Sequence, residues 1–387
     1  MKSSTRCVHL EANGDPYGAI SPPIYQTATF RQESASEFGE YDYTRTANPT
    51  RQLLEQQLAA LEGGAYACAF ASGMAAITAL TRTLEIGDHI IAGNDLYGGT
   101  VRLLDQVLAR SGIYISYIDA TDLDEVRASL TARTKLVLIE TPSNPLLRIA
   151  DIKALAELAH SVGALLVVDN SMLSPCFQQP LAVGANVVIH SATKFLCGHS
   201  DVTAGALITS DPTLHQKIAF QQNAEGAGLS PFDSWLLLRG MKTLCLRAER
   251  QNASARAIAQ FLFEHPAVEH VYYPGLNAHA GHQLHRAQAV GDGAVISFET
   301  GDANFSQRVV SSTKLFTIAV SFGSVNSVIS VPHAMSHASI PASLKQSLAP
   351  PRDLVRLSIG IEDVDDLITD LDQALAITTV NVGAACR

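Results

Sequence analysis

The residue with the clearest chemical potential is Lys194. It follows two hydroxyl residues, Ser191 and Thr193, directly after an apolar run, residues 187–189. A strand that ends in such a stretch is typical of a ligand site, where the lysine amine faces an anionic or electrophilic group, because a buried lysine without a partner is costly. Taken alone, the stretch is equally compatible with a surface lysine in an ordinary loop.

Other polar groups stand at comparable points of the chain. Residues 140–144 and Asp169-Asn170 each follow an apolar run, and Ser72-Gly73-Met74 precedes a helix-like run, residues 75–80. Ligands gather at the carboxyl ends of strands in open α/β sheets, and amides at the start of a helix can hold a phosphate. A serine before a helix is by itself only a common N-cap. Together, these groups predict one ligand site.

The cofactor that needs such parts is pyridoxal phosphate, which binds to a lysine and requires a carboxylate beside its ring nitrogen. Lys194 supplies the amine, and Asp169 would keep the ring nitrogen protonated, since an opposite charge shifts a pKa by roughly 1–3 units. Alone, Asp169 would serve equally well as a helix cap after a strand. The residues expected to grip the phosphate are Ser191, Thr193, Gly73 and Met74.

The elements that must position these residues indicate an α/β fold. Short continuous apolar strands alternate with amphipathic helices, which predicts a mostly parallel sheet covered on both faces. Asp151 caps one of these helices, whose apolar residues lie on one face. The chain predicts strands over residues 135–140, 165–169, 187–190, 270–272 and 295–298, and helices over 50–61, 75–80, 152–159 and 247–263.

Three units are expected along the chain. Residues 1–50 have little periodicity and read as an extended N-terminal arm. Residues 51–248 form the cofactor-binding domain, and residues 249–387, with shorter and more mixed strands, form a smaller α/β C-terminal domain. The length of 387 residues agrees with such a division.

Composition excludes several classes of protein. The net charge of −10, without a basic cluster, argues against nucleic acid as a partner. The sequence predicts no membrane span and no secretory signal, so a cytoplasmic location is expected. The cysteines have no Cys-x-x-Cys pair and are expected to be reduced thiols without a metal; they are Cys7, Cys68, Cys176, Cys197, Cys245 and Cys386.

Motifs along nearly the whole chain resemble the Cys/Met-metabolism pyridoxal-phosphate enzymes, the transsulfuration group. The resemblance implies the aspartate-aminotransferase-like fold of pyridoxal-phosphate-dependent transferases, fold type I. Its motifs are Tyr41-Asp42-Tyr43-Thr44-Arg45, Ser72-Gly73-Met74-Ala75, Asp95-Leu96-Tyr97-Gly98-Gly99, Thr141-Pro142-Ser143-Asn144-Pro145, Val168-Asp169-Asn170, residues 191–201 and Leu354-Val355-Arg356-Leu357-Ser358.

The resemblance also implies roles for individual residues. Tyr97 would stack on the cofactor ring and take part in proton transfer with Lys194, the expected base. Tyr43 and Arg45 would reach the phosphate of a neighbouring subunit, so a homo-oligomer, a dimer of dimers, is expected. The substrate carboxylate would be bound by Arg356, with Ser321 and Asn144 nearby.

Two residues narrow the expected reaction. Family members that act at the γ-carbon of cystathionine usually carry a glutamate where Val320 stands, and methionine γ-lyases typically show a cysteine where Gly99 stands. Further likeness to plant-type members implies a cystathionine β-lyase of methionine biosynthesis. Such an enzyme converts L-cystathionine, an amino-acid thioether, to homocysteine, pyruvate and ammonia.

Alternatives remain at this level, because a fold does not settle a reaction. The family also contains γ-lyases, γ-synthases and broader carbon–sulfur lyases that act on cystine or methionine. A more remote alternative is a regulatory protein that keeps the pyridoxal-phosphate fold. Its sign would be an added DNA-binding segment or the loss of Lys194, Asp169 or Arg356, and all three residues are present.

Overall fold

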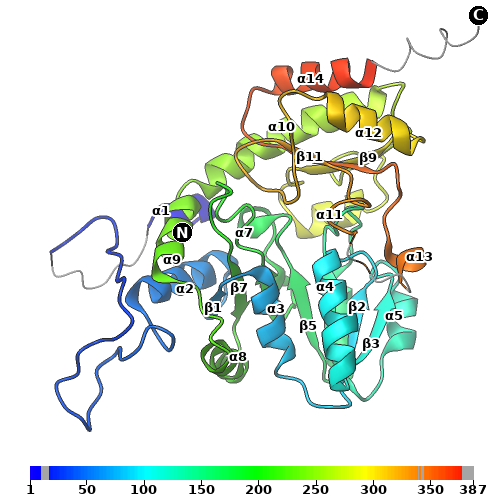
Figure 1. The fold of residues 1–387 in the computed structure, drawn as a ribbon. Helices are drawn as coiled ribbons and strands as arrows, with labels where there is room; N and C mark the ends of the chain where they lie inside the picture. The colour runs from blue at the N-terminus through cyan, green and yellow to red at the C-terminus, as the bar shows by residue number, and fades with distance from the viewer. Residues whose placement is uncertain (10–16, 339, 341–343, 377–387) are drawn as a thin grey trace, which may run out of the picture.

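Two β-sheets organise the chain, one of seven strands and one of five. A computed structural model describes residues 1–9, 17–338, 340 and 344–376. In Figure 1 the larger sheet lies in the lower part of the molecule, and the smaller sheet lies above it beneath α10, α12 and α14. No helix among the described residues is long and apolar enough to cross a membrane.

The larger sheet has the strand order β1-β7-β6-β5-β4-β2-β3. Neighbours from β6 through β3 run parallel, whereas β7 pairs antiparallel with both β1 and β6. The sheet is therefore mixed but mostly parallel, as expected. Its strands are β1 (Tyr66–Phe70), β2 (His89–Gly93), β3 (Tyr114–Ile118), β4 (Thr134–Glu140), β5 (Leu165–Asp169), β6 (Val187–His190) and β7 (Gly205–Thr209).

Helices cover both faces of this sheet because its strands are apolar on both sides. Leu136 and Leu138 pack into one core with α3 and α8, while Val137 and Ile139 pack into another with α5 and α6. These and the neighbouring helices are α2 (Pro49–Glu62), α3 (Gly73–Thr81), α4 (Gly98–Leu103), α5 (Leu123–Ser129), α6 (Ile152–Ser161), α7 (Ser174–Phe177), α8 (Pro212–Ala224) and α9 (Pro231–Met241).

The smaller sheet has the order β10-β11-β12-β9-β8 and shares one core with the helices above it. Its strands are β8 (His270–Tyr272), β9 (Val295–Glu299), β10 (Thr317–Ile318), β11 (Val328–Ser330) and β12 (Val355–Ser358). The helices of this region are α10 (Leu244–Glu264), α11 (His282–Gln288), α12 (Ala303–Ser312), α13 (Lys345–Leu348) and α14 (Val364–Ala376).

The N-terminal region is a short helix, α1 (Ser3–Val8), and a long segment that leads to α2. The described part of that segment, blue in Figure 1, projects away from both sheets. An isolated bridge between Thr29 and Tyr43 holds it as a hairpin-like excursion. The arm predicted over residues 1–50 stays a prediction, and α1 within it is a helix whose Cys7 is buried in the core.

The predicted strands and helices are confirmed, with ends that differ by up to three residues. Asp151 accepts a hydrogen bond from the Ala154 amide at the start of α6, and Gly63 ends α2 in the left-handed conformation. The predicted boundary at residues 248 and 249 falls inside α10 and stays a prediction.

Candidate active site

A cavity of about 480 Å³ lies between the two sheets. Its wall on the side of the larger sheet contains Glu140, Asp169 and Lys194, and its wall on the other side contains Val320 and Arg356. Since β4, β5 and β6 run parallel, the residues at their carboxyl ends meet at one edge of the sheet. The ligand site predicted there is therefore a single cavity.

Lys194 is half-buried in this cavity, and its Nζ donates a hydrogen bond to Ser321 Oγ at 2.5 Å. Burial and, after it, the positive charge of Arg356 lower the pKa of the lysine to about 8, although Asp169 and Glu140 act in the opposite direction. A lysine with such a pKa is a usable base near neutral pH.

Asp169 ends β5 and faces the cavity. Its Oδ1 accepts a hydrogen bond from the Ser171 amide at 2.9 Å, and Ser171 Oγ accepts one from the Ser191 amide at 2.6 Å. Burial raises the pKa of Asp169, against the influence of Ser171, His190 and Lys194. The carboxylate therefore lies in a place where a cationic partner would be favourable.

The start of α3 also lines the cavity. Ser72 Oγ accepts the amide of Ala75, so the amides of Gly73 and Met74, which have no acceptor inside a helix, remain for a ligand. A Cβ atom on Gly205 would lie 2.1 Å from Ser72 O, so only glycine lets β7 pass this close to the helix start. The geometry suits an anion.

The two hydroxyls predicted to grip the phosphate differ in their surroundings. Ser191 lies against the start of α3, because a Cβ atom on Gly73 would come 3.2 Å from its Cα. Thr193 Oγ1 instead accepts from the Ala204 amide at 2.9 Å and donates to Ala204 O at 3.2 Å. Thr193 lines the cavity, but its proton must leave Ala204 before it can serve a phosphate.

Tyr97 precedes α4 and lines the cavity with 42% of its surface exposed. Its amide donates to Glu140 Oε2 at 3.3 Å. A Cβ atom on Gly99 would lie 2.4 Å from Tyr97 Cε1, so the glycine leaves room for the ring in this position. The ring is free to stack on a planar ligand.

Arg356 is only 2% exposed and stands in β12. Its Nη1 donates to Asn144 Oδ1 at 2.7 Å, and its Nη2 donates to Ser321 O at 2.9 Å. Burial lowers its pKa to about 10, so the guanidinium stays charged at neutral pH. These contacts bring together the three residues expected at the substrate carboxylate.

Tyr43 and Arg45 are not part of this cavity within the chain. Both are exposed on the arm, and Arg45 Nη1 donates to the backbone and side-chain oxygens of Asn223. The predicted contact with a neighbouring subunit stays a prediction.

Sequence reasoning gave no role to two residues of the site, Glu140 and Ser171. Glu140 was noted only as polar, yet it is 7% exposed, and burial, with the charges of Asp169 and Asp95, raises its pKa well above the ordinary value. Ser171 joins Asp169 to Ser191. The place of Glu140 after an apolar run put it in the predicted ligand site but did not show that its carboxyl is buried.

The residues of the cavity fit pyridoxal phosphate by the chemistry of their donors. Helix amides and Ser191 lie where an anionic phosphate is favoured, and the acids Asp169 and Glu140 lie where a protonated ring is favoured. Lys194 offers an amine of lowered pKa, and Tyr97 offers an exposed aromatic face.

Comparisons with known proteins agree with this chemistry. The family model described as "Cys/Met metabolism PLP-dependent enzyme" matches residues 4–376. The chain is 54% identical to the chloroplastic cystathionine β-lyase of Arabidopsis thaliana, covering 96% of this chain and 80% of that one. It is 47% identical to the cystathionine γ-lyase of Bacillus subtilis, covering 97% and 99%.

A solved structure is similar over almost its whole length. The cystathionine γ-lyase from Lactobacillus plantarum complexed with L-serine superposes with a TM-score of 0.94 at 43% identity, covering 97% of this chain and 99% of that one. The fold class, the family resemblance and the cofactor expected from the sequence are confirmed. This chain belongs to the Cys/Met metabolism PLP-dependent enzyme family.

Proposed function

We propose that the protein is a carbon–sulfur lyase that cleaves L-cystathionine at its β-carbon. The products are homocysteine, pyruvate and ammonia, with one water consumed. Cleavage at the β-carbon, and not at the γ-carbon, is favoured by Val320. This apolar side chain lies in the cavity wall and is 56% exposed. A valine offers no charge to hold the distal ammonium of cystathionine where γ-cleavage would need it.

Pyridoxal phosphate, when bound, supplies an electron sink for the carbanion at the substrate α-carbon. Lys194 would hold its aldehyde carbon and Asp169 its ring nitrogen. Gly73, Met74 and Ser191 would hold its phosphate, and Thr193 would join them after releasing Ala204. This assignment rests on the position of these residues along one cavity.

Arg356 orients the substrate by its α-carboxylate. Two of its N–H groups are committed to Asn144 and Ser321, which fixes the plane of the guanidinium and aims the remaining donors. Arg102, an exposed residue of α4, also lines the cavity and offers a cation for the second carboxylate of cystathionine. An amino acid with a carboxylate at each end suits these two cations.

Lys194 removes the α-proton, because its lowered pKa leaves a useful fraction of the amine neutral near pH 8. Ser321 Oγ, 2.5 Å from Nζ, aims the amine. The departing thiolate of homocysteine then receives a proton from the ammonium of Lys194 or from Tyr97, which stands at the same cavity.

The deciding experiment identifies the keto acid released from L-cystathionine. Pyruvate with homocysteine is expected, and mostly 2-oxobutyrate would overturn the proposal in favour of a γ-lyase. A V320E variant tests the carrying observation, since a carboxylate in that wall should increase the share of 2-oxobutyrate. V320L, which adds bulk without charge, is the matched control and should leave the share unchanged.

We also propose that the protein acts in the cytoplasm, in methionine biosynthesis, as a homo-oligomer. The free thiols of Cys7, Cys68, Cys176, Cys197 and Cys245 support a reducing compartment, whereas Cys386 lies outside the described residues. The projecting arm with exposed Tyr43 supports contact with a second copy. Analytical ultracentrifugation and cell fractionation test these proposals.

A further inference from the structure

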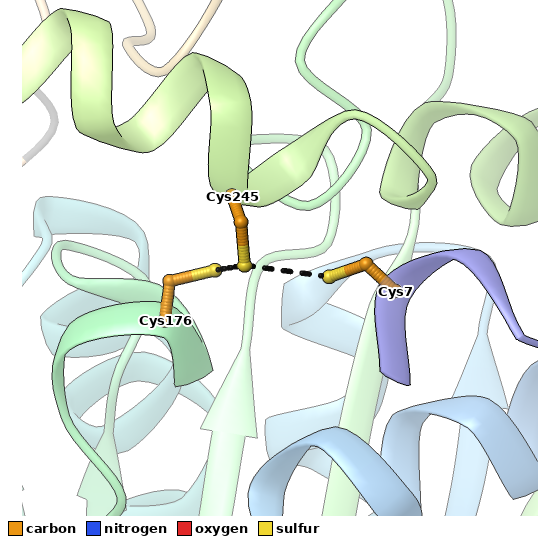
Figure 2. Close-up of side chains that lie close together, drawn as sticks. All are labelled: Cys7, Cys176 and Cys245. Carbon is orange, nitrogen blue, oxygen red and sulfur yellow. Dashed lines mark hydrogen bonds between the residues drawn. The ribbon is translucent and has the colours of Figure 1, made fainter. Parts of the chain in front are cut away.

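Three cysteines from distant parts of the chain meet at one point outside the active site. Cys7 comes from α1, Cys176 from α7 and Cys245 from α10. The Cys176 and Cys245 sulfurs are 2.8 Å apart, and the Cys7 and Cys245 sulfurs are 3.6 Å apart. Figure 2 shows the three side chains pointing toward one another, with Cys245 in the middle.

The other described cysteines are not part of this cluster. Cys68 contacts His215, and Cys197 contacts Asp201. Within the cluster, Cys7 and Cys245 are 2% and 6% exposed, whereas Cys176 is only half-buried. A small solute can therefore approach the sulfurs from the side of Cys176.

A metal ion fits this geometry poorly. With a zinc–sulfur distance of about 2.3 Å, two thiolates on a tetrahedral ion would lie about 3.8 Å apart. The Cys176–Cys245 separation of 2.8 Å is too short for that. Structural zinc also takes four ligands, and among the described residues the cluster has only these three. The separation is closer to that of a bonded pair, about 2.05 Å.

Cys245 has the character of the reactive thiol. Hydrogen bonds from the thiols of Cys176 and Cys7 lower its pKa, and the positive charge of Arg247 acts in the same direction. The hydrogen bond with Cys245 raises the pKa of Cys176. Because the Cys245 sulfur lies between those of Cys7 and Cys176, it is the one that two neighbouring thiols can stabilise as a thiolate, with Cys176 beside it as the resolving partner.

We propose that Cys245 and Cys176 form a reversible disulfide when the protein meets a peroxide. The Cys245 thiolate attacks the peroxide oxygen, giving a sulfenic acid and hydroxide. The sulfur of Cys176 then attacks the sulfenic sulfur, the S–S bond forms, and its proton and the sulfenic hydroxyl leave as water. Two thiols are oxidised, one peroxide is reduced, and a dithiol such as dithiothreitol reverses the reaction.

The cross-link would tie together two segments that border the active site. Cys176 lies in α7, a few residues after Asp169 and Ser171. Cys245 lies in the first turn of α10, whose Arg247 donates to the carbonyls of Phe195 and Leu196, next to Lys194. Oxidation would therefore restrain the segments that carry the cofactor carboxylate and lysine against unfolding.

The test uses the full chain with bound cofactor and a Cys386→Ser background, which leaves five thiols. Treatment with hydrogen peroxide should reduce the thiol count in denaturant from five to three. Mass spectrometry should find the peptide of Cys176 linked to that of Cys245, and dithiothreitol should restore all five. The oxidised protein should also melt at a higher temperature than the reduced protein.

Two further variants keep the proposal falsifiable. Cys245→Ser should retain its four thiols and show no oxidation-dependent shift in Tm. Cys68→Ala, the matched control outside the cluster, should still lose two. An unchanged thiol count in the parent would overturn the proposal, as would a link between Cys7 and Cys245, or zinc that co-purifies in stoichiometric amount and blocks oxidation.

Discussion

Two cations, the half-buried Lys194 and the buried Arg356, set the chemistry of the site at the scale of residues. Burial and the nearby guanidinium hold the pKa of Lys194 at about 8, while Arg356 keeps a pKa of about 10 and stays charged. The same arginine therefore binds an anionic substrate and helps to free the lysine for work as a base. The negative charges of Asp169 and Glu140 raise the pKa of Lys194 and so oppose part of this lowering.

The pH dependence of kcat should report this arrangement. The neutral amine of Lys194 is the base, and its fraction grows as pH rises through the lowered pKa, so kcat should increase from pH 6.5, reach half of its maximum near pH 8 and level off about one pH unit above that. Steady-state rates at saturating L-cystathionine measure it. A kcat that is constant from pH 6.5 to 9 would contradict the assignment.

Replacing Arg356 by lysine should reduce kcat/KM for L-cystathionine by about 100-fold, since a point charge cannot replace the two-pronged contact with carboxylate. The loss arises because one ammonium cannot serve Asn144 Oδ1, Ser321 O and a substrate together. The visible absorbance of bound cofactor should persist in this variant. Wild-type kinetics in R356K would rule out Arg356 as the carboxylate site.

At the scale of elements, the phosphate end of the cavity depends on how closely β7 approaches the start of α3. Gly205 in β7 lies against the carbonyl of Ser72, the residue that caps α3. The helix start can aim its amides into the cavity only because this contact involves no side chain.

Gly205→Ala should therefore weaken cofactor binding and destabilise the protein by about 1–3 kcal/mol, as for other overpacked sites. Its Cβ would lie 2.1 Å from Ser72 O, so the backbone must move. Cofactor titration and denaturant unfolding measure the two effects. Gly39→Ala is the control, because its Cβ would meet only Gln32 Oε1 at 3.6 Å. Equal cofactor affinity and equal stability of the two variants would show that the close contact between Gly205 and Ser72 is unimportant.

At the scale of the whole molecule, the cavity is assembled from both sheets, and the arm stands apart from it. Arg356 and Asn144, which form one hydrogen-bonded pair, are 212 residues apart in the chain. The site therefore forms only when the smaller sheet packs against the larger one. Tyr43 and Arg45 are exposed on the arm, although Arg45 is hydrogen-bonded to Asn223 of its own chain.

Mixing two inactive variants should restore activity if the arm completes the site of a partner subunit. A Lys194→Ala protein and an Arg45→Ala protein, unfolded together and refolded, should regain roughly a quarter of the wild-type activity, because half of the random dimers contain one intact site. The assay should contain little pyridoxal phosphate, so that the Arg45→Ala protein alone, which binds the cofactor weakly, stays inactive. No recovery in refolded dimers would mean that Arg45 acts within its own chain.

The sequence by itself determined the local elements and the chemical class of the site. Strand and helix periods and the Asp151 cap are local properties, so they could be predicted. The sequence indicated the cofactor from Asp169 and Lys194, which follow successive strands, and from the helix start at Ser72-Gly73-Met74. This was possible because parallel strands bring their carboxyl ends together.

Only the tertiary structure decided which distant residues touch. The bond of Thr193 to Ala204, the burial of Glu140, and the meeting of Cys7, Cys176 and Cys245 follow from packing between segments far apart in the chain. Cysteines that looked scattered became one cluster. The physical reason is that pKa shifts and contacts depend on burial and distance in space, and these are fixed by long-range packing and not by local pattern.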